Sequence, residues 1–494
     1  MATTLKKQAL SAVLWTGLGR CGRQGVMLLI QLVLARLLER EEFGLLVIPV
    51  AIASLSKILV DGGFGRALIQ KKDITEADKC SVFYFNIFVG FLITAGIALS
   101  APWIATFYGK PQLAPLIRWI SLAVLIRSIG TNHSQLLTKA MNFKAQLKAT
   151  MVAVLIGGAT GITLAAIGFG VWALVAQTLV IATVWAIAIW IVSPWRPSWR
   201  FSWSSLKSLL PFGSRVFASS LLTSVFSNLY MLLFGKLFTV GATLGDYTQA
   251  RRLQLAPTGI ISNIVQRVSF PLFASIQDSH EKIRVVMRKS ISMLCLINMP
   301  IILFLATSGE VLITVLIGEK WLPAVPYLRI IAIWGIIQPL QTIHVQKFMG
   351  LGHSGLYLKI DILRKGLTIL NILITYHFNS ILIMLAGQAL CNLIGFLICM
   401  HETRKLIDYS FRDQFADMAK PALVTGIMAA GVWAIGLLSL NVFLLLGLQI
   451  LVAGVIWFGL ALLLRIPIFM EMLGMGRAVL AKRKRRKTNE LDTE

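Results

Sequence analysis

The amino-acid sequence predicts an all-α integral membrane protein, on the evidence of its composition, its apolar runs and the placement of its basic residues. Of the 494 residues, 57% are hydrophobic and 14% are charged, and the mean hydropathy is +0.78. A water-soluble protein of this length needs a largely polar surface, which this composition does not supply. About fourteen apolar runs recur along the chain, each long enough to cross roughly 30 Å of hydrocarbon.

The apolar runs give the expected order of the transmembrane helices. The first run, Ala9 to Leu38, is too long for a secretory signal and lacks a small-residue cleavage site, so we expect an uncleaved first helix. The expected spans are residues 11–38, 43–65, 80–101, 113–133, 147–168, 170–193, 211–235, 245–270, 290–308, 323–348, 357–377, 379–400, 417–438 and 440–465.

The basic residues are distributed unevenly between the two sides of these spans. Of the 47 Lys and Arg, thirty lie in one set of connections and at the termini, and four lie in the alternate connections. This bias predicts that both termini are cytoplasmic, as an even number of spans requires. It also accounts for the net charge of +26 without nucleic acid as a partner.

Two segments of the sequence match at a constant offset. Residues 114–135 and 325–346 share seven identities in 22 positions without a gap. Apolar helices match by chance at Leu and Ile, but seldom at Pro, Arg, His and Gln in register. The shared residues therefore indicate an internal duplication, with a common entry helix as the alternative. The pairs are Pro115/Pro326, Arg118/Arg329, Ile120/Ile331, Ile126/Ile337, Thr131/Thr342, His133/His344 and Gln135/Gln346.

The duplication gives the expected domains. Residues 1–207 form an N-terminal lobe of six spans, and residues 208–402 form a C-terminal lobe of six. Two appended helices (403–466) and a basic cytoplasmic tail (467–494) follow. Because six is even, the repeats are parallel, an arrangement in which transporters bind substrate between the halves near the midplane.

Polar residues interrupt spans 1, 2, 7 and 8 at helical spacing, which places them along one face of each helix. A charged side chain at the bilayer centre costs about 2.5–3.5 kcal/mol, so it faces protein or a water-filled cavity. By symmetry, we expect the four polar faces to meet across one cavity. Its expected cations are Arg20, Arg23, Lys57, Arg215, Arg251, Arg252 and Arg267, its carboxylates are chiefly Asp61 and Asp246, and Gln24 and Asn263 add amide groups.

The excess of positive charge suggests what the cavity binds. Lys57 and Asp61 are i,i+4 neighbours that can pair, and Arg267 near a span end can reach the headgroups. Several cations then remain without a partner, and buried charge without a partner is unstable. An anionic substrate would supply one, and guanidinium groups suit diphosphate and carboxylate. Structural ion pairs are the alternative. Similarly, His133 and His344 are either proton carriers or interfacial hydrogen-bonding residues.

Other chemistries find little support in the sequence. The longest connections have under about twenty residues, so no domain is available to carry the carboxylates of a membrane-bound glycan polymerase or ligase. The five cysteines form no CxxC pair and are not accompanied by spaced histidines, so no disulfide framework or metal site is expected. We predict no enzyme activity, catalytic residue or cofactor.

Short motifs along the chain resemble those of bacterial polysaccharide flippases. The likeness is to the Wzx-like lipopolysaccharide and colanic-acid exporters of the multidrug/oligosaccharidyl-lipid/polysaccharide superfamily, and it covers essentially the whole chain. The residues that carry it are Leu34-Ala35-Arg36, Glu42-Phe43-Gly44-Leu45, Asp61, Phe64-Gly65, Ala67, Ile69-Gln70, Phe270-Pro271, Ile276-Gln277, Gly318-Glu319-Lys320-Trp321 and Pro326.

The resemblance implies two lobes that rock about a cationic cavity in the bacterial inner membrane. It implies transport of undecaprenyl-diphosphate-linked oligosaccharide to the outer leaflet for lipopolysaccharide or exopolysaccharide biosynthesis, with a polymerase and a chain-length regulator as possible partners besides membrane lipids. By similarity, the diphosphate is held by Arg20, Arg23, Arg215, Arg251 and Arg252. Lys57 departs from the pattern expected of the family. A peptidoglycan-precursor (lipid II-type) flippase and a drug or cation antiporter of the same superfamily remain alternatives.

Overall fold

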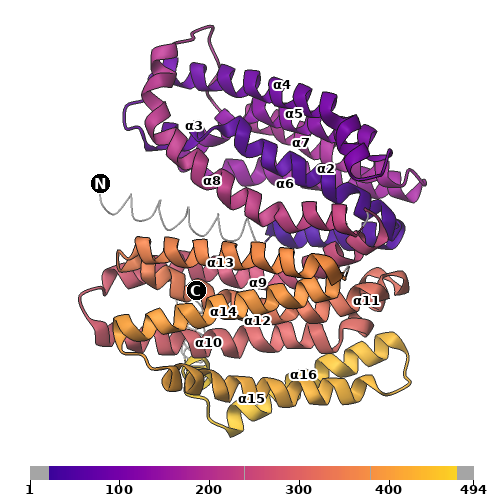
Figure 1. Cartoon of the computed structure of the whole chain (residues 1–494), viewed down its shortest axis with the longest axis vertical. Coiled ribbons are helices and arrows are strands. Elements are labelled where there is room, and N and C mark those ends of the chain that lie inside the picture. Colours follow the sequence, from indigo (N-terminus) through magenta and orange to yellow (C-terminus); the bar gives the residue numbers. More distant parts are fainter. Residues whose placement is uncertain (1–21, 239, 379, 475–494) are drawn as a thin grey trace, which may run out of the picture. The chain divides into compact units, whose positions relative to one another are not determined.

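The structure is a computed structural model that describes residues 22–238, 240–378 and 380–474 (Figure 1). The basic run Lys482 to Lys487 and the start of the first expected span lie outside these ranges. Every regular element within them is a helix, which confirms the predicted all-α class.

Each predicted span overlaps a helix. The first is described over residues 22–37. The others are α2 (Arg40–Asp61), α4 (Glu76–Phe107), α5 (Leu113–Lys139), α6 (Phe143–Ala166), α7 (Val171–Val192), α8 (Trp203–Leu237), α9 (Ala242–Ser275), α10 (His280–Thr307), α12 (Val325–Gly350), α13 (Ser354–Thr375), α14 (Ile381–Ile407), α15 (Phe411–Gly436) and α16 (Val442–Leu463).

Within the described ranges, eleven helices are long and apolar enough to cross a membrane. The helices α9 and α13, which carry charged residues in their interiors, are not among them. The chain is therefore a multi-pass membrane protein, and the count of fourteen spans stays a prediction. Two short helices that the sequence did not predict, α3 (Phe64–Gln70) and α11 (Gly309–Ile317), follow α2 and α10.

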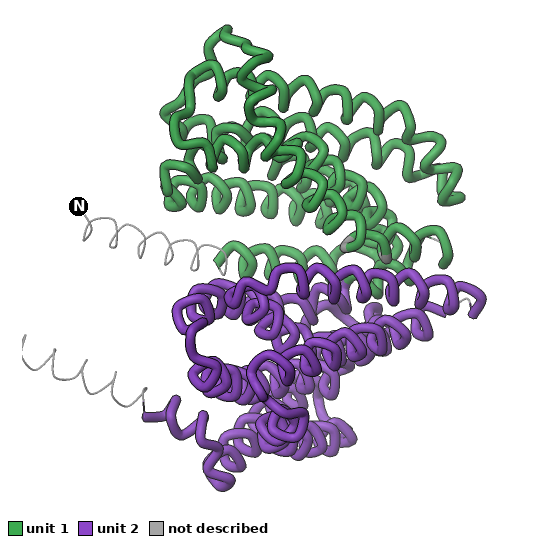
Figure 2. The backbone as a smooth tube through the Cα atoms, turned by 60° about the vertical axis from the view of Figure 1, so that its left-hand side comes forward, with its two compact units in different colours: residues 1–248 green, residues 249–494 purple. Residues whose placement is uncertain are grey.

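The chain divides into two compact units, residues 1–248 and 249–494 (Figure 2). The boundary falls inside α9, and α8 packs against α2, α3 and α4 of the first unit. The predicted division after residue 207 follows the repeat in the sequence instead. The predicted lobe boundaries stay predictions.

Corresponding helices of the two expected repeats have the same neighbours. In the first unit α5 packs against α4 and α7, and α6 packs against α7. In the second unit α12 packs against α10 and α14, and α13 packs against α14. The order of contacts along the chain is thus repeated, as a duplication requires.

The paired residues also make matching polar contacts. His133 Nδ1 lies 3.1 Å from Ser193 Oγ, 60 residues further on, and His344 Nδ1 lies 2.6 Å from Thr403 Oγ1, 59 residues further on. Both imidazoles are buried. These contacts support the duplication and show His133 and His344 as interior hydrogen-bonding residues that join neighbouring helices.

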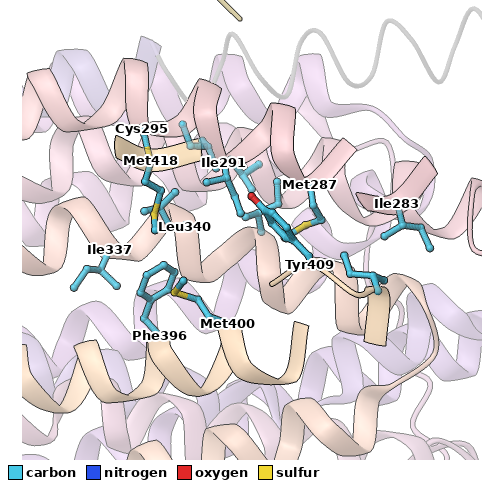
Figure 3. Packing of buried hydrophobic residues seen from close by; sticks show 14 of the residues in the cluster. Ile283, Met287, Ile291, Cys295, Ile337, Leu340, Phe396, Met400, Tyr409 and Met418 are labelled. Atoms are coloured by element: carbon cyan, nitrogen blue, oxygen red, sulfur yellow. The ribbon is translucent and has the colours of Figure 1, made fainter. Parts of the chain in front are cut away.

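The second unit is held together by an apolar core between α10, α12, α14 and α15 (Figure 3). The i, i+4 spacing of Ile283, Met287, Ile291 and Cys295 places their side chains on one face of α10. All four are almost fully buried.

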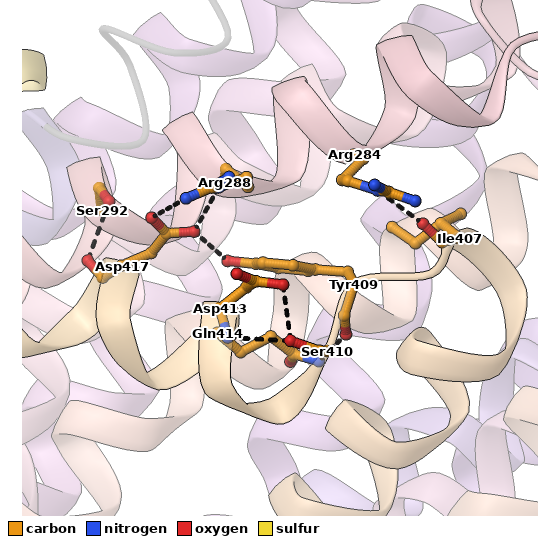
Figure 4. A network of polar contacts seen from close by, with 9 residues as sticks. All are labelled: Arg284, Arg288, Ser292, Ile407, Tyr409, Ser410, Asp413, Gln414 and Asp417. Atoms are coloured by element: carbon orange, nitrogen blue, oxygen red, sulfur yellow. Dashed lines mark hydrogen bonds and ion pairs between the residues drawn. The ribbon is translucent and has the colours of Figure 1, made fainter.

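Polar contacts then fix the appended helix α15 to α10 (Figure 4). The Arg288 guanidinium binds both oxygens of the Asp417 carboxylate at 2.8 and 3.0 Å, and the Tyr409 hydroxyl donates to the same carboxylate at 2.7 Å. Burial, followed by the hydrogen bond to Asp417, raises the pKa of the Tyr409 phenol well above its ordinary value. Tyr409 therefore stays protonated and continues to donate at physiological pH.

Candidate functional site

The first unit brings several of the predicted cavity residues together. Lys57 on α2 interacts electrostatically with Arg23 on the first helix and with Arg127 on α5, as well as with Asp61. Arg127 and Arg23 also act on each other. Lys57 thus lies near two further cations and one carboxylate. We call Arg23, Lys57, Asp61 and Arg127 the cationic cluster.

Asp61 and Lys57 do not form the ion pair that their spacing suggested. The Asp61 carboxylate instead accepts a hydrogen bond of 2.5 Å from the Gln135 amide. Among the described residues, no carboxylate lies within ion-pair distance of Lys57 or Arg23. Both of these cations are exposed, so their charge is open to an external partner.

The backbone around Asp61 explains its contacts. The predicted helix 43–65 was too long, because α2 ends at Asp61 and Gly62 and Gly63 both have positive φ values, +52° and +78°. Gly65 leaves room for this contact, because a Cβ there would lie 1.6 Å from Gln135 Nε2 and would displace the amide. The turn between α2 and α3 therefore presents Asp61 to α5 at a place where Gln135 can reach it.

The sequence analysis did not predict two of the residues at this site. Arg127 and Gln135 lie eight residues apart on α5, so both point to nearly the same side of the helix. The Arg127 guanidinium lies over the Trp185 ring at 5.4 Å, which fixes its position. A basic residue inside the apolar run of α5 was the available signal for Arg127. Gln135 was recognised only as a repeated position.

Asp246, the second carboxylate expected in the cavity, already forms an ion pair within the protein. Arg40, which the charge count placed in an outer connection, binds both oxygens of the Asp246 carboxylate. The Asp246 side chain is 2% exposed and that of Arg40 is 28% exposed. Asp246 is therefore part of a buried structural pair, and this arrangement argues against a role for Asp246 as a free ion ligand.

For the remaining predicted residues, convergence with this cluster stays a prediction. Arg20 lies outside the described residues. Arg215 is exposed on α8, and no described carboxylate lies within ion-pair distance of it. On α9, Arg252 and Asn263 are exposed and Arg251 is half-buried. These α9 residues belong to the second unit, so their convergence with the cationic cluster stays a prediction, as does the role of the half-buried Gln24.

Comparison with protein families identifies the chain. Residues 33–326, more than half of the sequence, match the family described as polysaccharide biosynthesis protein. The chain belongs to this family. The prediction of a Wzx-like member, made from short motifs, is confirmed at this level.

Related polysaccharide biosynthesis proteins come from several bacteria. The teichuronic acid biosynthesis protein TuaB of Bacillus subtilis is 29% identical over 87% of this chain and 90% of its own length. The lipopolysaccharide biosynthesis protein WzxC of Escherichia coli is 28% identical over 68% of each chain. The succinoglycan biosynthesis transport protein ExoT of Rhizobium meliloti is 26% identical over 66% of each.

Solved structures confirm the fold. The lipid II flippase MurJ, in an inward closed conformation, matches 92% of this chain and all of its own with a TM-score of 0.76 and 13% sequence identity. An inward-facing multidrug resistance transporter of the MATE family matches 78% of this chain with a TM-score of 0.59 and 17% identity. The polysaccharide biosynthesis family and this transporter fold agree with the prediction that the chain is a membrane transporter and not an enzyme.

Proposed function

We propose that this protein flips an undecaprenyl-diphosphate-linked oligosaccharide from the cytoplasmic to the outer leaflet of the bacterial inner membrane, with both termini in the cytoplasm. The cationic cluster carries the proposal. It holds three cations, and its one carboxylate is already bound by Gln135. The cluster therefore has positive charge available for an anionic ligand.

The energetic argument rests on this imbalance. A cation within the hydrocarbon region costs about 2.5–3.5 kcal/mol on insertion scales, so three cations need water or an anion beside them. A diphosphate supplies two phosphates in a row, and the guanidinium groups of Arg23 and Arg127 can each bind phosphate oxygens in a bidentate manner. We infer that Lys57 adds a point charge between them.

The available carboxylates disfavour a cation antiporter. Binding a cationic drug or a metal ion within a membrane calls for carboxylates that are not already compensated. In the first unit Asp246 is bound by Arg40 and Asp61 is bound by Gln135. A peptidoglycan-precursor flippase is the nearer alternative, because its substrate shares the diphosphate and the MurJ fold is similar.

Substitution of the cluster tests the proposal. Arg23→Ala, Lys57→Ala and Arg127→Ala should each abolish polysaccharide export in a deletion strain at unchanged protein level. Arg118→Ala is a matched control, because Arg118 lies on the same helix as Arg127 and donates a hydrogen bond to the Ala98 carbonyl, at 3.3 Å. Wild-type export by all three cluster variants would contradict the proposal.

Binding measurements separate the substrate classes. The purified protein should bind undecaprenyl-diphosphate-oligosaccharide more tightly than lipid II. The Arg127→Ala variant should bind neither ligand. Tighter binding of lipid II would favour the peptidoglycan alternative. As partners we propose the polymerase and chain-length regulator of the same polysaccharide, which copurification from membranes would test.

A further inference from the structure

The connection between α7 and α8 lies along the start of α4. The Trp195 indole N–H donates to Glu76 at 2.9 Å, the Ser202 N–H donates to Ser81 Oγ at 2.8 Å, and the Tyr84 hydroxyl donates to the Ser198 carbonyl at 3.2 Å. Glu76 and Tyr84 are eight residues apart, so the connection follows α4 for about 12 Å. It is thus a fixed segment that runs beside the helix.

The contacts with α4 indicate how deep in the membrane this connection lies. The apolar run of α4 begins at Cys80, one turn before Tyr84, and the Trp199 ring stacks on the Tyr84 ring with a centroid distance of 5.9 Å and an interplanar angle of 18°. Trp199 therefore lies level with the first turn of the apolar run. This is the depth at which headgroups meet hydrocarbon, where tryptophan is enriched in membrane proteins.

The outer face of the connection is both aromatic and basic. Trp199 is 95% exposed, Phe201 is 57% exposed and Trp203 is 64% exposed. One exposed aromatic residue needs no explanation, but three within five residues form a surface that water solvates poorly. Arg200 and Lys207 are exposed beside them. The nearby Glu76 accepts hydrogen bonds from Trp195 and Lys79 and also interacts electrostatically with Arg200, whereas Lys207 adds further positive charge.

We propose that residues 195–207 form a docking surface for anionic phospholipid headgroups of the cytoplasmic leaflet. The aromatic rings enter the boundary between headgroups and acyl chains, and Arg200 and Lys207 bind the lipid phosphates. Charge complementarity selects anionic lipid, because a basic residue near such a surface contributes about 1 kcal/mol. The indole rings alone would enter any bilayer equally well.

The surface is mechanically connected to the cationic cluster. At the start of α8, Leu206 and Leu209 are buried against Phe64 and Leu68 of α3. The α3 helix begins three residues after Asp61, so its position sets the turn that presents Asp61 to Gln135. Lipid bound at the surface therefore holds the α2–α3 turn at a defined depth.

Quenching by brominated lipids tests the proposal in the full-length protein. The fluorescence contribution of Trp199, obtained by subtracting the Trp199→Phe variant, should be quenched more by brominated phosphatidylglycerol than by brominated phosphatidylcholine. The double variant Arg200→Gln/Lys207→Gln should lose this preference. Trp103, 74% exposed near the other end of α4, is the matched control, because its quenching should not respond to the double variant.

Each other outcome would overturn the proposal. Quenching of Trp199 by aqueous iodide but not by brominated lipid would place the connection in the cytoplasm. Equal quenching by both lipids would remove the selection of anionic headgroups. A response of Trp199 to soluble oligosaccharide, without a response to lipid, would make the surface a glycan platform. Unchanged elution in size-exclusion chromatography verifies that the variants are folded.

Discussion

The Gln135 amide donates a hydrogen bond of 2.5 Å to the Asp61 carboxylate, and no carboxylate in the described part of the chain lies within ion-pair distance of Lys57, one helical turn away from Asp61. A local spacing argument favours the Lys57–Asp61 pair, but the chain leaves α2 at Asp61 and turns toward α5. The charge of Lys57 is therefore available to an anionic ligand, as part of the cationic cluster.

Gly65→Ala should disrupt the Asp61 contact. The added Cβ would meet Gln135 Nε2 at 1.6 Å, so the amide must move and its partly buried hydrogen bond to Asp61 is lost. We expect loss of export and a decrease of about 1–3 kcal/mol in the free energy of unfolding. Gly96→Ala on α4 is the control, because nothing lies within 4 Å of its added Cβ. Equal stability of the two variants would contradict the contact.

Arg20, Arg215 and Arg252 are predicted to hold the diphosphate together with the cationic cluster. Replacing any one of them by Ala should abolish polysaccharide export while the protein level stays unchanged. Replacement by Lys should preserve part of the export, because Lys keeps the charge but loses the bidentate geometry. Immunoblots of membranes give the protein level. Loss of folded protein would indicate structural pairing instead.

Breaking the Arg40–Asp246 pair should be costly. Asp246→Asn leaves a partly buried guanidinium without its counter-charge, so we expect the free energy of unfolding to fall by about 3 kcal/mol. Glu310→Gln breaks the exposed Arg329–Glu310 pair, whose side chains are 49% and 62% exposed, and should cost less than about 1 kcal/mol. Denaturant unfolding in detergent compares the two variants. Similar losses of unfolding free energy would argue that burial does not distinguish the two ion pairs.

The topology follows from the basic residues. Reporter fusions after residues 110, 240, 320 and 440 should be external, and fusions after residues 75, 200, 410 and 480 should be cytoplasmic. Phosphatase and fluorescent reporters give opposite signals on the two sides. Two or more inverted fusions would refute both the orientation and the repeat derived from it.

The membrane potential should assist outward transport. Moving one elementary charge across 100 mV is worth about 2.3 kcal/mol, and an anionic headgroup moves outward down an inside-negative potential. In proteoliposomes, an imposed potential should therefore speed flipping without an ion gradient. A rate that ignored voltage, followed a sodium or proton gradient and vanished in Asp61→Asn would show instead that Asp61 is the coupling site.

The sequence by itself was enough to predict a helical membrane protein, the approximate positions of its apolar helices and an internal duplication. These properties depend on apolar length and on charge counted over short segments, which are local. Arg118, Pro115 and His133 revealed the repeat because polar identities in an apolar helix are improbable. The helix 43–65 was extended too far, because Gly62 and Gly63 take positive φ values and end α2 at Asp61. A Cβ on Gly63 would also lie 2.1 Å from the Gly213 carbonyl oxygen of α8, a contact between helices that periodicity cannot reveal.

Only the tertiary structure decided which charges are compensated. Arg40 and Asp246 are 206 residues apart, and Gln135 lies 74 residues from Asp61. No periodicity within one helix can pair residues on different helices, because such contacts depend on how the helices cross. The folded chain therefore removed Asp246 from the candidate site and added Arg127 to it.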